Sequence, residues 1–522
     1  MVSHFDDDFD VTWTDPRDAD SIWAIDRIHF THPLTPLTED LYRAVVASSW
    51  ATPVVFVNGY AYFKDFAPPP TPREVIERGA AAVWREKYLP LVKEICTRIR
   101  VRDYDAMSAA EVVEGLPGVF EESAEAFSYP TVVASAFMGP GMALADFCDR
   151  EIGADGPMMV ATLLQGFAND SIAAGVGLGE LAEFAATRPE VAMALRERNF
   201  DSIPSVSGGE EFMAKFVGFL EAYGWRAEEW SLAQTPTWIE EPQTPLYLIS
   251  RYLHDPSHSP AEAMRRSVQQ REVMAEQIEA RLTQDKRAEF QGLLATAQSY
   301  VQFSEERALW QLIAIGSVRV PVLALGRMLV EEGAVQEPDD VFYLTMTELR
   351  ELAARPSPAF DLVAERRAEH AHREKLKPPL SIGRPLVLSE RPRISQIVHR
   401  FFFGAEPEQE EGDLIRGVGA SQGVMTGRAR IIQSLGESDR LEAGEILVCR
   451  NTAPPWTPLF AIAGAVVTDV GGLLSHSAIC AREYAIPCVV GTGVATSRIR
   501  DGSIITVDGT NGTINLEAAV SR

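Results

Sequence analysis

The 522-residue sequence is short of three features that would each point to a compartment or a partner. It has only five cysteines, an odd and scattered set that suits a reducing compartment better than a disulfide framework. Basic residues are scarce: 48 Lys and Arg against 74 Asp and Glu give a net charge of −26, which repels phosphate backbones and anionic lipid. We find no apolar run near the ~20 residues that span a bilayer, and the opening MVSHFDDDFD lacks the regions of a secretory signal. We therefore expect a cytoplasmic protein that binds neither nucleic acid nor membrane.

The first three quarters of the sequence favour helices. The length suggests about three or four domains, and residues 75–375 carry mainly helical periodicity. Within them the run 309–329 is apolar on nearly every face, which predicts an interior helix that Pro321 kinks or splits. Residues 1–74, rich in prolines and aromatics, are expected to form loops and short strands.

After residue 413 the pattern changes to that of strands. The acidic segment 404–412 has the composition of a linker, although a surface loop within one domain is the alternative. Short apolar runs bounded by Gly, Asp or Asn predict strands at 428–432, 445–448, 464–467, 486–490 and 503–507, with one helix at 475–484. The predicted fold is therefore multidomain: a mainly α domain over 1–403, a hinge at 404–412, and an α/β domain over 413–522.

One stretch within the predicted α/β domain contains the candidate catalytic residue. Residues 471–483 read GGLLSHSAICARE, so an apolar strand runs into a Gly-Gly turn and His476 falls in the first turn of the following helix. Free N–H groups and the positive end of the helix dipole favour an anion there. Imidazole is a competent nucleophile near neutral pH, so an accessible His476 is suited to carry a phosphoryl group. The alternative is that His476 merely caps or packs a strand–helix turn.

The longer stretch 471–491, GGLLSHSAICAREYAIPCVVG, closely resembles the phosphohistidine motif of the phosphoenolpyruvate-utilising family. Residues 419–429 resemble the entry of that family's swivelling domain, and residues 501–512 resemble its closing hairpin. The resemblance implies that 413–522 is a swivelling domain with His476 as the phosphohistidine. It also implies a set of phosphate-binding residues: Gly472, Ser475, Ser477 and Arg482.

Two positions depart from the family pattern. Gln422 stands where a proline is usual, and Leu474 replaces the threonine that is regulatory in plant dikinases. Regulation through that threonine is therefore not expected.

A weaker resemblance, to the helical domain of rifampicin phosphotransferase and its relatives, covers much of residues 20–400. It is carried by HFTHPLTPL (29–37), YGWR (223–226) and LGRMLVEEGAVQEPDDVFYLTMTEL (325–349). It implies that 1–403 is an acceptor domain that binds the substrate. The candidate substrate-binding residues are His29, His32, Trp225, Arg226 and Arg319.

These candidates have simpler interpretations. His29 and His32 could be structural residues of a Pro-rich turn instead of a general base or pocket lining. Arg319 could be the buried partner of a carboxylate instead of a phosphate clamp. Relatives usually have histidine where Trp225 stands, so any role of that histidine is lost here.

Nothing in the sequence resembles the ATP-grasp domain or the C-terminal barrel of the family, and no G-x-x-x-x-G-K-[ST] occurs. The resemblance then implies that a separate ATP-grasp subunit charges His476 from ATP with Mg²⁺. This organisation occurs in two-component aryl phosphate synthases, which phosphorylate phenol or 4-methylphenol. We therefore expect one subunit of a phosphotransferase that acts on a small aromatic alcohol. The alternatives are a phosphotransferase for a bulkier alcohol such as an antibiotic, and a non-catalytic regulatory or binding relative.

Overall fold

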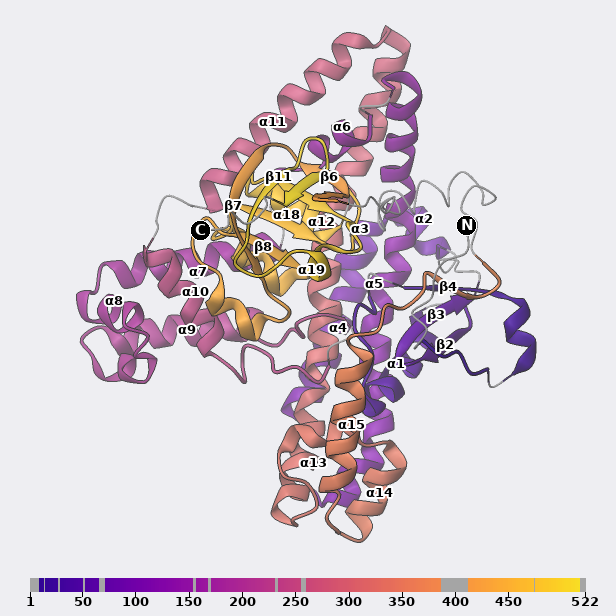
Figure 1. Ribbon diagram of the computed structural model, residues 1–522, viewed down its shortest axis with the longest axis vertical. Coiled ribbons are helices and arrows are strands. Elements are labelled where there is room, and N and C mark those ends of the chain that lie inside the picture. The colour runs from indigo at the N-terminus through magenta and orange to yellow at the C-terminus, as the bar shows by residue number, and fades with distance from the viewer. Residues whose placement is uncertain are drawn as a thin grey trace. The chain divides into compact units, whose positions relative to one another are not determined.

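The chain divides into two compact units (Figure 1). The first comprises Met1–Ala136, Glu229–Pro236 and Trp310–Glu390, and the second comprises Phe137–Glu228, Thr237–Leu309 and Arg391–Arg522. The computed structural model describes residues 9–13, 15–26, 29–49, 52–64, 71–153, 156–167, 170–230, 233–254, 260–385, 412–473 and 475–516.

The predicted hinge at 404–412 lies outside the described residues except for Gly412, so the predicted domain boundaries stay a prediction. The predicted fold class is confirmed, since a large helical region precedes a C-terminal α/β sheet region. The second compact unit joins the described part of 413–522 to helices from the region before it.

The first unit contains a four-stranded antiparallel sheet in the order β2-β3-β1-β4. The strands are β1 (Ile22–Ile25), β2 (Val54–Val57), β3 (Tyr60–Lys64) and β4 (Ser381–Gly383). Asn58 and Gly59 join β2 to β3 with φ of 51° and 79°, the positive values that a tight two-residue hairpin turn requires. Strand β4 pairs with β1 from more than 350 residues away in the sequence, so the N-terminal strands are completed by a distant segment.

Helices form the rest of the first unit. They are η1 (Pro16–Asp20), α1 (Pro36–Ser49), α2 (Arg73–Arg78), α3 (Ala80–Val83), η2 (Trp84–Tyr88), α4 (Leu89–Val101), α13 (Arg319–Glu331), η4 (Pro338–Tyr343), α14 (Met346–Ala354) and α15 (Phe360–Arg373). The boundary between the units falls within two long helices, α5 (Ala109–Glu151) and α12 (Gln284–Ser317). Helix α1 lies in the segment where only loops and strands were expected, so that expectation was incomplete.

The apolar run near Pro321 is split, as predicted. Helix α12 ends at Ser317 and α13 begins at Arg319, because proline has no N–H to donate to the carbonyl four residues earlier. The segment Glu305–Glu331 is long and apolar enough to cross a membrane, so our expectation of no such run was wrong. However, 83% of its apolar window is buried inside the fold, as in a core helix.

The helical part of the second unit comprises seven further helices among the described residues. They are α6 (Gly156–Leu163), α7 (Asp170–Ala186), α8 (Pro189–Arg196), η3 (Phe200–Ser205), α9 (Gly209–Tyr223), α10 (Gln243–His254) and α11 (Pro260–Arg281). Its core joins Leu144, Phe147, Leu163 and Phe290 to Leu473, which belongs to the turn before His476. The turn that carries the motif is therefore anchored in a helical core.

An eight-stranded sheet, coloured orange to yellow in Figure 1, belongs to the rest of the second unit. Its strand order is β5-β12-β11-β7-β8-β9-β10-β6. The strands are β5 (Leu414–Arg416), β6 (Val418–Ser421), β7 (Val424–Ile431), β8 (Ile446–Cys449), β9 (Ala465–Thr468), β10 (Cys488–Val490), β11 (Ile504–Asp508) and β12 (Thr513–Leu516). Strands β7 to β10 run parallel, and the outer strands pair antiparallel. The short helices are η7 (Leu435–Arg440), η8 (Pro454–Trp456), α17 (Thr457–Phe460), α18 (His476–Glu483) and α19 (Ala495–Arg498). All five predicted strands and the predicted helix are confirmed, with ends that differ by at most four residues.

Gly509 lies in the turn between β11 and β12, where backbone atoms of neighbouring strands pack closely against it. A Cβ at Gly509 would lie 2.0 Å from the Ser421 carbonyl oxygen and 2.6 Å from the Cys488 amide nitrogen. We expect Gly509→Ala to destabilise the sheet by about 1–3 kcal/mol, because backbone atoms must move. Gly436→Ala is the control, since Gly436 is exposed and a Cβ there meets only Ser434 Oγ at 3.5 Å. Urea unfolding followed by circular dichroism measures both; equal midpoints would contradict the prediction.

Candidate active site

The site begins where strand β9 ends and the chain turns into helix α18. Gly471 has φ of +124°, and a Cβ there would lie 2.8 Å from Ser475 Oγ, so the turn requires glycine. The Ser475 amide donates to the Gly472 carbonyl (3.1 Å), and the Ser475 hydroxyl accepts from the Ala478 amide (3.4 Å). Ser475 is therefore the N-cap, and His476 is the first helical residue, as predicted.

His476 is enclosed by polar groups. Its Nδ1 lies 3.2 Å from Glu305 Oε2, and its Nε2 lies 3.2 Å from Thr457 Oγ1 and 3.3 Å from Cys480 Sγ. The Phe460 ring meets the imidazole edge-on, with 6.4 Å between centroids. The His476 side chain is 7% exposed, so the expectation of an accessible side chain is wrong for this arrangement.

These contacts favour one tautomer of the neutral ring. An ionised carboxylate only accepts hydrogen bonds, so the bond to Glu305 places a proton on His476 Nδ1. In the neutral ring Nε2 then carries the lone pair. The Thr457 hydroxyl donates to the Pro454 carbonyl at 2.9 Å, which leaves the Cys480 thiol to face that lone pair as a weak donor. Nε2 is therefore the ring nitrogen whose lone pair could act as a nucleophile.

The other predicted phosphate-binding residues divide into two groups. Gly472 and Ser475 lie in the turn beside His476. Ser477, in contrast, hydrogen-bonds Thr452 (2.8 Å), and Arg482 Nη1 donates to the Ala420 carbonyl (2.9 Å). Six residues turn a helix by about 240°, so Arg482 points to a different side of α18 from His476. The phosphate-binding roles of all four stay predictions.

Polar contacts link the C-terminal end of α18 to the helical part of the same unit. Glu483 Oε1 accepts from the Gly166 amide at 2.6 Å, and Ser267 Oγ donates to the carbonyls of Arg482 and Glu483 at 2.9 and 3.2 Å. Arg271 Nη1 donates to the carbonyl groups of Gln165 and Gly166. Burial raises the pKa of Glu483 to about 7 and lowers the pKa of Arg482 to about 10.

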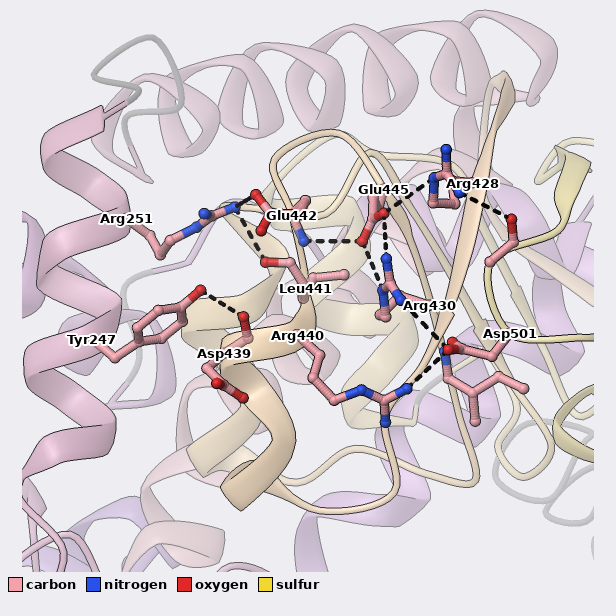
Figure 2. A network of polar contacts seen from close by, with 12 residues as sticks. Tyr247, Arg251, Arg428, Arg430, Asp439, Arg440, Leu441, Glu442, Glu445 and Asp501 are labelled. Carbon is pink, nitrogen blue, oxygen red and sulfur yellow. Dashed lines mark hydrogen bonds and ion pairs between the residues drawn. The ribbon is translucent and has the colours of Figure 1, made fainter. Parts of the chain in front are cut away.

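Helix α10 makes a second set of polar contacts with the α/β region, shown in Figure 2. Tyr247 donates to the Asp439 carbonyl at 2.8 Å, and Arg251 Nη2 donates to the Leu441 carbonyl and to Glu442 Oε2 at 3.2 and 2.8 Å. The Tyr252 hydroxyl donates to the carbonyl of Pro458, the residue after Thr457, at 3.0 Å. The helical part thus contacts both the η7 segment and the helix that carries Thr457.

On the η7 side of these contacts, an ion-pair network within the α/β region orders the segment that α10 meets (Figure 2). Arg430 forms a two-bond pair with Glu445 at 3.0 and 2.8 Å, and Glu445 also accepts from the Glu442 amide. Arg440 reaches Asp501 at 2.9 Å. These pairs hold the segment 435–445 in the conformation that presents the Asp439 and Leu441 carbonyls to α10.

His29 and His32, predicted to bind substrate, lie in the first unit with carboxylate partners. His29 Nδ1 lies 2.8 Å from Asp26 Oδ2, and its ring meets Trp230 edge-on at 5.3 Å. His32 Nδ1 lies 3.0 Å from Glu374 Oε2, and its Nε2 lies 3.9 Å from Glu229. The carboxylate–imidazole pairs suit either a general base or a structural turn, so the substrate-binding role stays a prediction.

The three other candidates are buried or partly buried. Arg319, in the first unit, donates to the Ala233 carbonyl (3.1 Å) and pairs with Asp339 (2.8 Å), so it has the carboxylate partner of the simpler interpretation. Trp225 and Arg226 belong to the second unit, where the Arg226 guanidinium lies over the Trp238 ring at 4.6 Å from its centroid. Their substrate-binding roles also stay predictions.

Sequence reasoning missed the three closest neighbours of His476. Glu305 lies 171 positions before it, at the charged start of the apolar run, and nothing in the local pattern joins the two. Thr457 follows Pro454-Pro455-Trp456, a segment without a recognisable motif. Cys480 could have been predicted as a neighbour of His476, because positions i and i+4 share a helix face, but it was noted only in the cysteine count.

Comparisons with known proteins find families that match two regions of the chain. Residues 441–512 match the family described as PEP-utilising enzyme, mobile domain, and residues 128–305 match the rifampicin phosphotransferase fourth domain. These matches confirm the resemblance to the phosphoenolpyruvate-utilising family and to rifampicin phosphotransferase. His476 lies within the mobile-domain match, and Glu305 is the last residue of the match to the rifampicin phosphotransferase fourth domain.

Several of the similar proteins are named as phosphotransferases. The chain is 29% identical to a rifampicin phosphotransferase of Streptomyces sviceus, over 80% of this chain and 48% of that protein. It is 31% identical to the uncharacterized phosphotransferase YvkC of Bacillus subtilis, over 60% of this chain and 38% of that one. Chondramide synthase cmdD of Chondromyces crocatus is 30% identical over 98% of this chain but only 14% of its own length. The chain thus spans less than half the length of each of these relatives.

The raised pKa of Glu483 gives a testable pH dependence. The folded chain holds this proton more tightly than the unfolded chain, for which the usual value of 4.5 applies. The resulting stability is fully present below pH 4.5 and is lost as the pH rises through about 7. Glutamine stays neutral, so the free energy of unfolding of the wild type relative to Glu483→Gln should fall by roughly 3 kcal/mol across this window.

Chemical denaturation at several pH values measures this difference, with the exposed Glu276→Gln on α11 as the control. A pH-independent difference between wild type and Glu483→Gln would contradict the prediction.

Proposed function

We propose that this chain is a phosphotransferase component that carries a phosphoryl group on His476 and delivers it to a hydroxyl group. The observation that carries the proposal is the geometry of His476, with Nδ1 hydrogen-bonded to Glu305 and the Nε2 lone pair directed away from it. The ring lies in the first turn of α18, where backbone N–H groups favour the negative charge of a phosphoryl group. The matches to a mobile domain and to a domain of rifampicin phosphotransferase support the same activity.

The phosphoryl donor in this proposal is ATP, bound by a separate ATP-grasp subunit. We find no ATP-grasp pattern and no G-x-x-x-x-G-K-[ST] within these 522 residues, so the proposal places the nucleotide site outside them. The His476 side chain is 7% exposed and Glu305 of the helical part lies against its Nδ1, so in this proposal the 413–522 region leaves this arrangement for charging. The 404–412 segment is the hinge that we propose for this movement.

Mg²⁺ is the expected companion of ATP, but the residues near His476 do not form a site for it. Within the part of the chain that the structure describes, no group of three or more His, Cys, Asp or Glu side chains could hold a metal ion. Mg²⁺ in phosphoryl transfer is usually held by one or two carboxylates together with phosphate oxygens. We propose that the ion is bound together with ATP by the partner, and we derive no step of this chain through it.

For the acceptor, we propose the hydroxyl of a small aromatic alcohol, in the manner of aryl phosphate synthases. The aromatic and carboxylate–imidazole groups around His29 and His32 suit an aromatic ring and a hydroxyl proton. A bulkier alcohol is the second candidate. Residues 128–305 match a rifampicin phosphotransferase domain, and two of the similar proteins are named as phosphotransferases. A transfer assay with phenol, 4-methylphenol and rifampicin separates the two.

Replacing His476 tests the carrier role. We expect His476→Ala to lower phosphoryl transfer by a factor on the order of 10³ or more, because the nucleophile is removed. His372→Ala, which removes an exposed histidine on α15, should retain wild-type transfer. Incorporation of radiolabelled phosphate from ATP in the presence of an ATP-grasp partner measures both. Acid-labile phosphate in the His476→Ala chain at the wild-type level would exclude the carrier role of His476, whereas a wild-type chain that takes up no phosphate would favour a non-catalytic relative.

The donor assignment is tested with the chain alone. We expect no AMP from ATP when the purified 522-residue chain is incubated with Mg²⁺ and a phenol, because the proposed nucleotide site lies on another protein. Addition of an ATP-grasp protein should start AMP formation and transfer. Sustained AMP formation by the isolated chain, as followed by chromatography, would show that a nucleotide site lies within these residues.

A further inference from the structure

The carboxylate that contacts His476 comes from a different region of the chain from the other groups around the ring. Thr457 and Cys480 belong to the 413–522 region, as His476 does, whereas Glu305 belongs to helix α12. The Glu305 side chain is 5% exposed, and its Oε2 lies 3.2 Å from Nδ1, the nitrogen opposite the nucleophilic one. A carboxylate in this position acts on the ring only while the 413–522 region is seated on the helical part of the unit.

We infer that Glu305 is a positioning residue for one half of the reaction, the discharge of phosphohistidine to the acceptor. The inference rests on the proposed carrier role of His476. In the discharge step Glu305 accepts the Nδ1 hydrogen bond and keeps the phosphorylated ring protonated at that nitrogen. In the charging step the 413–522 region has left the helical part, so Glu305 does not contact the ring.

The chemistry of the step explains why the Nδ1 proton matters. The acceptor oxygen attacks phosphorus, an O–P bond forms, and the P–Nε2 bond breaks with its electron pair returning to Nε2. If Nδ1 is protonated, the leaving group is a neutral imidazole; if it is not, the leaving group is an imidazolate, which is far less stable. The hydroxyl proton passes to water, so the step releases a phosphate ester, a neutral His476 and one proton.

Few ionisable groups face the ring in the described residues. Glu305 on α12 and Cys480 on α18 contact His476, while Thr457 on α17 does not titrate. Arg482 and Glu483, further along α18, contact Ala420 and Gly166 instead. Burial raises the pKa of the Cys480 thiol well above its usual value, so the thiol stays neutral. Glu305 is therefore the charged group whose removal changes the ring's environment most.

The experiment charges the full chain without the partner, by use of phosphoramidate, a reagent that phosphorylates imidazole nitrogens. Loss of phosphate from His476 to water and to phenol is then followed by phosphorus NMR, with His476→Ala to identify the signal. Glu305→Gln keeps the size of the side chain and removes its charge. Glu306→Gln, at the next position of α12 and partly exposed, is the matched control. Circular dichroism verifies that the variants are folded.

We expect the stable isomer to carry phosphate on Nε2, and discharge in Glu305→Gln to be at least tenfold slower than in the wild type and in Glu306→Gln. The extent of charging by phosphoramidate should be the same in all three. In the wild type the rate should fall as the pH rises and the Nδ1 proton is lost. In Glu305→Gln that fall should begin at a lower pH. A loss of docking alone would lower the rate without moving the pH profile.

Three results overturn the inference. Phosphate found on Nδ1 would place it where Glu305 now lies. A Glu305→Gln chain that discharges with the wild-type rate and pH profile would leave the carrier role intact and remove the role of Glu305. A wild-type phosphohistidine that discharges no faster than free phosphohistidine would instead overturn the carrier role, and the role of Glu305 with it.

Discussion

The hydrogen bond between Glu305 and His476 is the interaction on which the arrangement of the second unit depends. Both side chains are almost fully buried, and a buried carboxylate is stable only when it is hydrogen-bonded or paired. His476 supplies that partner from the first turn of α18, a position set by the Gly471 turn and the Ser475 cap. When this contact forms, the α/β region therefore lies against the helices and the imidazole takes its orientation at the same time.

Several polar contacts between the α/β region and the helices accompany this hydrogen bond, and most of them involve backbone carbonyls. Tyr247, Arg251, Tyr252 and Ser267 each donate to a carbonyl of the α/β region. Each such bond contributes about 1 kcal/mol net, since water replaces it on separation. Among the apolar contacts, Leu473 reaches the helical core from the turn before His476. An interface of this kind holds a defined geometry but suits a carrier that leaves and returns, as the proposed function requires.

The contact between Glu305 and His476 also separates the roles of neighbouring residues in helix α18. His476 and Cys480 share the face of α18 that meets Glu305 and Thr457. Arg482 and Glu483 face the sheet and the Gly166 segment, where burial lowers the pKa of the arginine and raises that of the carboxyl. A single eight-residue helix thus serves the reactive nitrogen at its N-terminal end and the interface at its C-terminal end.

The sequence by itself determined the local features of this protein. Apolar runs bounded by glycine, Asp and Asn defined the strands of the sheet, the Gly-Gly turn and Ser475 defined the start of α18, and Pro321 defined the break after α12. These features depend on residues within a few positions of one another, so local periodicity and stereochemistry are sufficient to read them. The tertiary structure alone decided which groups meet: β4 completes the N-terminal sheet from residue 381 onward, and Glu305 reaches His476 across 171 positions. No pattern of spacing encodes such contacts, because they follow from how helices and sheet pack, and packing is a property of the whole buried surface.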